Sequence, residues 1–132
     1  MYVGMTVEEF YQAFDRREIK LVDLDGEGMF SPALVVRSNG RVLVTGEIDK
    51  RHGDWIIFRI AINDRRYRTV AGLSVGSTLA DLKRAYPGLK ILMGEGQQFA
   101  YAETESLSFG LDADIGKQPP DRSRVTSILM LN

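Results

Sequence analysis

The chain has 132 residues, of which 44% are hydrophobic and 27% are charged, and its formal net charge is −1. Such a length and composition are typical of one folded globular domain, and the nearly neutral charge gives no bulk electrostatic basis for binding nucleic acid or an anionic membrane surface. The absence of cysteine excludes disulfides, thiolate catalysis and cysteine-based metal sites, and no apolar run approaches the ~20 residues of a membrane span.

The first element expected is a short helix that begins after Thr6. Thr6 is a suitable N-cap, and Glu9 stands three residues later, which together form the capping-box pattern. Val7, Phe10 and Phe14 are spaced by three and four residues, so they form one apolar stripe. This pattern predicts a helix of two to three turns with one buried face.

Four antiparallel strands are expected after this helix. The clearest signal is Asn39-Gly40 between two β-rich runs, because this pair is preferred in two-residue hairpin turns with positive φ at both positions. The expected strands cover residues 19–24, 33–38, 41–45 and 55–63, with Val42, Val44 and Ile48 alternating beyond the turn and a polar loop at 49–53.

The stretch Val75–Gly88 repeats the pattern of Val3–Phe14 at an offset of 72 residues. Thr78 is the expected N-cap with Asp81 at the capping-box position, and Leu79, Leu82 and Tyr86 form the apolar stripe. Pro87-Gly88 ends the helix. The expected strands of this second half cover residues 89–93, 98–103, 107–112 and 124–131.

These matches predict a duplicated α+β fold. The two helices match at an offset of 72 residues. The Gly-Glu-Gly turns at 26–28 and 94–96 match at an offset of 68, and the last strands match at an offset of 69, with Val125 opposite Ile56. We expect a single domain, 1–132, made of two pseudo-repeats at about 1–68 and 69–132. Each has one short helix followed by about four antiparallel strands, with the helices packed on one face of the sheet.

The two Gly-x-Thr helix starts, each followed by antiparallel strands, resemble those of tandem-repeat bacterial envelope proteins. The resemblance includes folds of the β-lactamase-inhibitor-protein type and outer-membrane assembly lipoproteins. The stretch from Val70 to Leu82 and the closing Arg124–Ile128 resemble a family of uncharacterised, stress-regulated envelope lipoproteins. The resemblance implies a periplasmic or envelope location and binding through a protein surface, with no catalytic residues. The lipid-carrying cysteine of such proteins is missing here.

The last strand of each half predicts a binding surface. If Ile56, Phe58, Ile60 and Ile62 face the helices, then Trp55, Ile57 and Arg59 face away, together with Ile128 and Met130 in the second half. A solvated face is expected to be more polar than this. The face is therefore a protein-partner site, a dimer interface, a ligand groove or an internal layer of the fold. The first hypothesis is a non-enzymatic interaction module that uses Trp55, Ile57, Arg59, Ile128 and Met130.

An alternative is a small-ligand or lipid carrier with a groove between sheet and helices. Such a groove would be lined by Phe10, Phe14, Leu82 and Tyr86. No cofactor is expected in either case. An enzyme is not expected either, because His52 is the only histidine, lies in the polar loop, and has no nucleophile motif beside it.

Three other motifs have structural explanations. Asp23, Asp25 and Glu27 with Gly28 imitate the start of a calcium loop, but Leu34 stands where the bidentate glutamate is needed, so no metal site is expected. Val75–Thr78 has neither the second glycine nor the lysine of a phosphate-binding P-loop. Arg65-Arg66-Tyr67-Arg68 is the densest basic patch and is interpreted as a solvated connector.

The start of the chain leaves two locations open. Met1 leads directly into the first capped segment, without a signal peptide. The chain is then either cytoplasmic, or an envelope protein from which a leader, with or without a lipid anchor, was removed. The abrupt beginning and the family resemblance favour the envelope.

Overall fold

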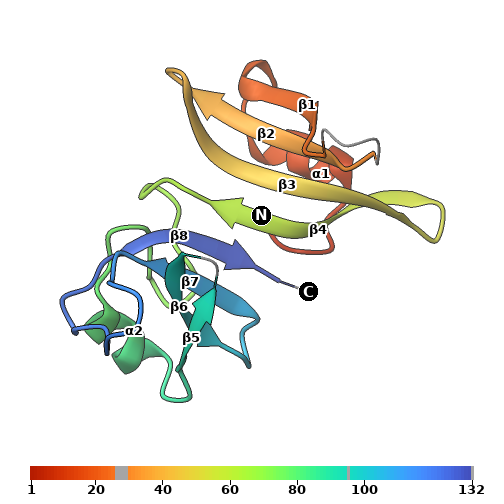
Figure 1. Ribbon diagram of the computed structural model, residues 1–132. Helices are drawn as coiled ribbons and strands as arrows, with labels where there is room; N and C mark the ends of the chain where they lie inside the picture. Colours follow the sequence, from red (N-terminus) through yellow and green to blue (C-terminus); the bar gives the residue numbers. More distant parts are fainter. Residues whose placement is uncertain (26–29, 95, 132) are drawn as a thin grey trace. The chain divides into compact units, whose positions relative to one another are not determined.

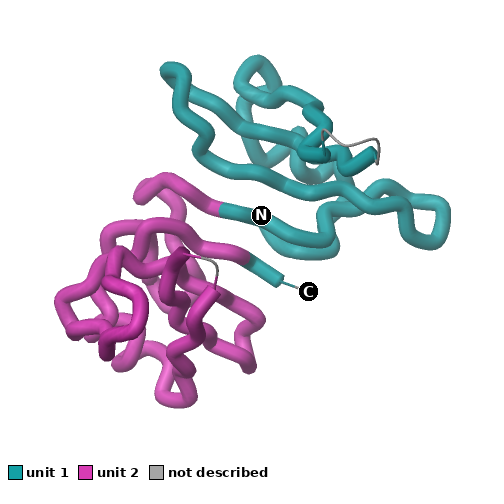
Figure 2. Tube along the Cα trace, in the orientation of Figure 1, with its two compact units in different colours: residues 1–61, 130–132 teal, residues 62–129 magenta. Residues whose placement is uncertain are grey.

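A computed structural model describes residues 1–25, 30–94 and 96–131. The fold consists of one short helix and four antiparallel strands, followed by the same sequence of elements again, which confirms the predicted α+β class (Figure 1). The chain divides into two compact units (Figure 2): unit 1 comprises Met1–Ala61 with Met130–Asn132, and unit 2 comprises Ile62–Leu129. The Gly-Glu-Gly turn at 26–28 and Glu95 of its counterpart lie outside the described residues.

Unit 1 begins with helix α1 (Val7–Ala13) and a short 3-10 helix (Arg16–Glu18). Its strands are β1 (Ile19–Asp23), β2 (Pro32–Ser38), β3 (Arg41–Arg51) and β4 (Asp54–Ile62), and they are ordered β1-β2-β3-β4. Asn39 and Gly40 have φ of 51° and 76°, so the predicted two-residue turn between β2 and β3 is confirmed.

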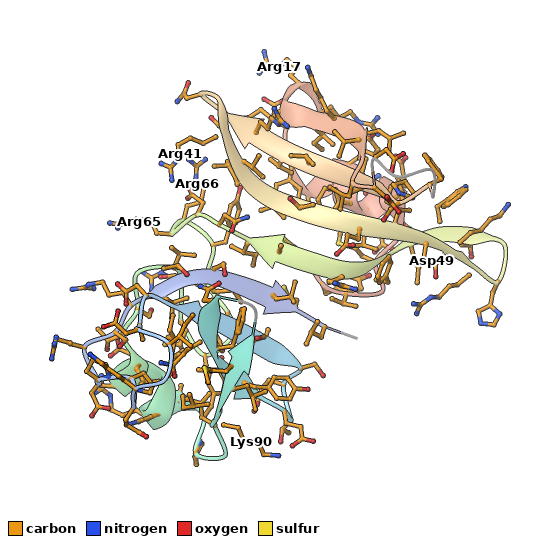
Figure 3. All side chains as sticks on the ribbon, in the orientation of Figure 1. Arg17, Arg41, Asp49, Arg65, Arg66 and Lys90 are labelled. Carbon is orange, nitrogen blue, oxygen red and sulfur yellow. The ribbon has the colours of Figure 1, made fainter. Side chains whose placement is uncertain are left out.

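Strand β3 is longer than predicted. The polar loop expected at 49–53 does not exist as such, because β3 continues to Arg51 and β4 begins at Asp54. His52 and Gly53 have φ of 52° and 85°, so they make a second two-residue turn of the same kind. Asp49 lies near the far end of this long hairpin (Figure 3). The polar residues before the turn are strand residues with exposed side chains, and composition alone suggested a loop.

Unit 2 contains helix α2 (Leu79–Ala85) and the strands β5 (Lys90–Gly94), β6 (Gln97–Ala102), β7 (Leu107–Leu111) and β8 (Val125–Met130), except for the last residue of β8. These bounds confirm the predicted strands of the second half to within two residues. Phe109 on β7 and Leu82 on α2 are fully buried, and the rings of Tyr86 and Phe109 are 5.7 Å apart. The core of unit 2 therefore lies between α2 and the strands.

The same hydrogen bonds hold the segment before each helix against the last strand of its unit. Gly4 N donates to Ile57 O (2.7 Å), and Ile57 N donates to Met5 O (2.9 Å). In unit 2, Gly76 N donates to Val125 O and Val125 N donates to Ser77 O, both at 2.8 Å. The duplication is thus visible in the backbone itself.

This pairing corrects the offset of the last strands. The helices repeat at 72, but Val125 corresponds to Ile57, an offset of 68, and not to Ile56 as the sequence comparison suggested. The runs around both residues are apolar at neighbouring positions. A shift of one residue therefore costs little in sequence similarity, although it exchanges the two faces of a strand.

Both helices begin with complete capping boxes, as predicted. Thr6 Oγ1 accepts from Glu9 N (3.1 Å) and Thr78 Oγ1 accepts from Asp81 N (3.2 Å). A hydrogen bond from Tyr2, followed by those from Thr6, lowers the pKa of Glu9, and hydrogen bonds from Thr78 lower the pKa of Asp81. Both carboxylates are therefore stabilised in their charged form.

We expect Thr78→Ala to lower the free energy of unfolding by about 1 kcal/mol at pH 7, because two bonds of the cap are lost. A carboxyl group with a lowered pKa stabilises the fold above its ordinary pKa, and this contribution is lost as pH falls through the lower folded value. The cost of Thr78→Ala should therefore shrink as Asp81 becomes protonated. Urea denaturation at pH 7 and near pH 3 measures it, and an equal cost at both values would contradict a role for the Asp81 charge.

Candidate functional site

An apolar groove of about 260 Å³ lies in unit 1. Three of the large side chains that line it are unusually exposed, with Leu21 61%, Phe30 71% and Trp55 48% accessible. Large apolar side chains gathered in one exposed depression are typical of interaction sites, whereas single exposed ones are ordinary. The full lining is Val7, Tyr11, Leu21, Phe30, Pro32, Leu34, Ile48 and Trp55.

Strand register explains why these residues share one face. Leu21 pairs with Leu34, and Leu34 pairs with Gly46 on β3. A Cβ on Gly46 would lie only 3.0 Å from the Phe10 ring, so this face is the one that α1 covers. Ile48, two residues after Gly46, lies on the same face. Helix α1 covers the middle of this face over Gly46, and the groove is formed where Val7 and Tyr11 of the helix meet exposed strand residues.

Cations lie on two aromatic rings of the groove. Lys50 Nζ is 5.6 Å from the ring centre of Trp55, and the Arg16 guanidinium is 5.0 Å from that of Tyr11. Arg16 is also paired with Glu8 at 3.1 Å, whereas Lys50 has no ion pair among the described residues. Lys50 therefore places a positive charge over the Trp55 ring, which favours an occupant with a nearby carboxylate.

The five residues predicted as a binding surface are placed differently from one another. A Cβ on Gly46 would lie 3.0 Å from the Phe10 ring and 3.3 Å from Ile57, so Ile57 is on the face that α1 covers. Trp55, two residues earlier, is on the same face, which is the reverse of the predicted orientation. Arg59 pairs with Glu47 (3.2 Å), the neighbour of Gly46, and therefore lies on the opposite face. Trp55 lines the groove, while Ile57 is completely buried.

The alternation of faces is interrupted in the last strand of both units. In β4 the buried residues Ile57 and Ile60 are three apart, and in β8 the buried Val125 and Ile128 show the same spacing. The interruption explains why Arg59, two residues after Ile57, lies on the other face. Ile128 is 1% exposed and Met130 is half-buried. Of the five predicted residues, Trp55 is the one that lines the groove.

The four residues proposed to line a ligand groove are packed within the two units. Phe10 and Leu82 are fully buried. The ring of Phe14 lies 4.8 Å from that of Phe10, and the Tyr86 hydroxyl donates to Thr69 Oγ1 (3.2 Å). The side chains expected to line a ligand groove therefore pack against other side chains of the protein.

The remaining polar candidates have local roles. His52 is an exposed turn residue. Asp23 Oδ1 accepts from Asp25 N and Ser31 N, so this carboxylate of the calcium-like motif binds backbone N–H groups. Glu27 and Gly28 of the motif lie outside the described residues. Within the described parts of the chain, no three acidic or histidine side chains gather as metal ligands, and no helix is long and apolar enough to cross a membrane.

The basic patch is divided. Arg66 pairs with Asp64 at 2.9 Å, whereas Arg65 and Arg68 line a polar depression of unit 2 together with Arg124. Figure 3 shows Arg65 extending away from the strands. Arg124 was not predicted to belong to this patch, because Arg124 is more than fifty residues away from Arg68 along the chain.

The groove was not predicted from the sequence either, and Trp55 is the one lining residue that was named as a binding residue. Its residues come from one helix, four strands and the segment before β2, so only the folded chain brings them together. One signal was available: Phe30 is a large apolar residue that closely follows the expected turn at 26–28, where polar residues are usual.

Comparison with known proteins identifies the fold. The chain superposes on the crystal structure of the uncharacterized protein yfeY from Escherichia coli with a TM-score of 0.68 and 16% sequence identity, covering 98% of this chain and 90% of that one. No protein-family model matches, and no curated protein matches significantly. At this identity the similarity concerns the fold alone.

Proposed function

We propose that the chain is a non-enzymatic protein-interaction module of the bacterial cell envelope, which binds an apolar segment of a protein partner in the groove of unit 1. The observation that carries the proposal is the exposure of Leu21, Phe30 and Trp55 around one depression. The envelope location rests on the resemblance of the repeated helix starts to envelope proteins, and fractionation of the native host tests it.

The size of the groove favours a protein side chain over a free ligand. Its volume of about 260 Å³ is below the roughly 300–1,000 Å³ of sites that enclose a small molecule. A depression of this size suits one or two large apolar side chains projecting from a partner. The charge of Lys50 beside Trp55 adds a preference for an acidic residue next to them.

Trp55 provides a direct probe, because it is the only tryptophan of the chain and lies in the groove. We expect peptides selected from a displayed random library against the folded protein to carry large apolar residues beside Asp or Glu. Binding should shift the Trp55 emission to shorter wavelength, because the ring loses contact with water. Phe30→Ser should weaken that binding by roughly tenfold or more, as expected when an apolar anchor of an interface is lost.

Leu92→Ser is the matched control, because Leu92 is 48% exposed on β5 of unit 2. Equal loss of binding in both variants would contradict the groove as the site. Light scattering tests self-association separately. A dimer of the wild type that Phe30→Ser dissociates would show that a second copy occupies the groove, and would overturn the assignment to a different protein.

A further inference from the structure

The polar depression of unit 2 has a lining suited to an anion. Its volume is about 310 Å³, and no acidic residue lines it. Three arginines approach it from two separate parts of the chain, the connector after β4 and the residue before β8. The lining residues are Arg65, Arg68, Ser74, Val75, Gly76, Ser77 and Arg124.

Two of the arginines are held in place by backbone carbonyls. Arg68 Nη1 donates to Gly72 O (2.9 Å), and Arg124 Nη1 donates to Gly76 O (2.8 Å). Each of these bonds uses one of the five N–H groups of a guanidinium, so donors remain for a ligand. The guanidinium of Arg65 lies over Gly76, where its Nη2 is 3.8 Å from the position that a Cβ would occupy.

The positive charge of this cluster is not neutralised within the described chain. Arg65, Arg68 and Arg124 have no ion pair there, whereas their neighbour Arg66 is paired with Asp64. Two carboxylates lie near Arg124, and neither forms an ion pair with its guanidinium. Asp81 pairs with Arg84, and Asp112 Oδ1 accepts from the backbone N of Arg124 (2.6 Å).

The duplication shows that the same backbone frame forms without an arginine at the position of Arg124. The hydrogen-bonded frame of Gly76 and Val125 is the same as that of Gly4 and Ile57 in unit 1. The isolated bridge Thr78–Arg124 corresponds to Thr6–Ile56, so the arginine replaces an isoleucine. At the helix offset of 72, Ser74 and Ser77 replace Tyr2 and Met5. One backbone frame thus carries Tyr2, Met5 and Ile56 without a charge in unit 1, and two serines with Arg124 in unit 2.

We propose that this depression binds the phosphate group of a phosphomonoester through Arg65, Arg68 and Arg124. A phosphomonoester carries about −1.5 to −2 charges near pH 7 and three strong acceptor oxygens, which matches three guanidiniums better than a single carboxylate does. The depression has room for roughly ten water molecules, more than a phosphate group alone needs, so the group to which the phosphate is attached can enter as well. The hydroxyl of Ser74, which has no partner among the described residues, is available to it.

The test is an NMR titration of the whole protein with inorganic phosphate and with glycerol 3-phosphate, at constant ionic strength. We expect saturable shifts of the Gly76 and Ser77 amides and of the arginine Nε–H signals. Arg65→Gln should weaken binding by roughly tenfold, as for loss of one charge-assisted pair. This variant breaks no hydrogen bond of the described fold, so its folding is not at risk.

Arg122→Gln is the matched control, because it removes the same charge two residues from Arg124 without touching the depression. Phosphatidylcholine vesicles with and without phosphatidic acid form a second arm. Vesicle binding that Arg65→Gln abolishes would assign the site to a lipid headgroup, and a response to glycerol 3-phosphate alone would assign it to a soluble compound. Linear, unsaturated shifts in both arms, or equal weakening by Arg122→Gln, would overturn the proposal. None of these outcomes depends on the groove of unit 1.

Discussion

Ile57→Asp is expected to leave most of the protein unfolded, whereas Trp55→Asp is expected to leave it folded. Ile57 is completely buried against the α1 face, while Trp55, two residues earlier on the same face, is 48% exposed. An aspartate at position 57 would bury a carboxylate without a partner and would also remove a core side chain. The combined cost of roughly 4–5 kcal/mol or more is comparable to the whole stability of many domains.

The cost of Trp55→Asp should be smaller, about 1–3 kcal/mol, because only the covered half of the ring loses apolar burial. The substitution removes the contact between the Trp55 ring and Lys50, which contributes about 0.5–1 kcal/mol at an exposed site, and leaves the new carboxylate in water. Urea denaturation followed by far-UV circular dichroism compares the two variants without relying on tryptophan fluorescence. Similar stabilities of the two variants would contradict the orientation of β4 described above.

Trp55 and Ile57 show what the alternation of a strand can predict and what it cannot. Trp55 and Ile57 were predicted to share a face, and they do, but the face is the one that α1 covers. A strand that is apolar on both faces contains no information about which face is inside. The decisive residue is Gly46, whose missing side chain leaves space for both the Phe10 ring and Ile57. That contact spans three separate elements, so no local pattern reveals it.

Local chemistry was predicted well for a matching reason. The caps at Thr6 and Thr78 and the turn at Asn39-Gly40 depend on residues within four positions of each other, and each was found as expected. The turn at His52-Gly53 is the exception among local features. Any residue other than glycine is uncommon at positive φ, and the polar side chains beside His52 resembled a loop.

The two candidate sites were hidden because both are assembled from distant segments. The groove joins residues from Val7 to Trp55, and the arginine cluster joins Arg65 to Arg124. Duplication nevertheless offers a way to find such sites. Where two copies share a backbone frame, as at Ile56 and Arg124, a charged side chain that only one copy carries is not needed to form that frame. Differences between the copies are therefore the better guide to binding.

Phe10→Ala and Leu82→Ala test the equivalence of the two cores. The two residues occupy the same position after their N-caps, offset by 72, and each is completely buried. We expect losses of about 3–5 kcal/mol for Phe10→Ala and about 2–5 kcal/mol for Leu82→Ala, because each leaves a cavity that the surrounding strands fill only partly. Chemical denaturation at pH 7 measures both, and Gln12→Ala on the exposed side of α1 is the control, with a change within about 0.5 kcal/mol.

A double-mutant cycle separates the contact of Phe10 with Gly46 from general loss of apolar volume. In the wild type, Gly46→Ala should cost about 1–3 kcal/mol, because its Cβ would meet the Phe10 ring at 3.0 Å and Ile57 at 3.3 Å. With Phe10 already replaced by alanine, the new methyl group enters the space that the ring vacated, and the cost should fall by at least about 0.5 kcal/mol. Additive costs would mean that the ring does not rest on Gly46, and would remove the contact that identifies the α1 face of unit 1.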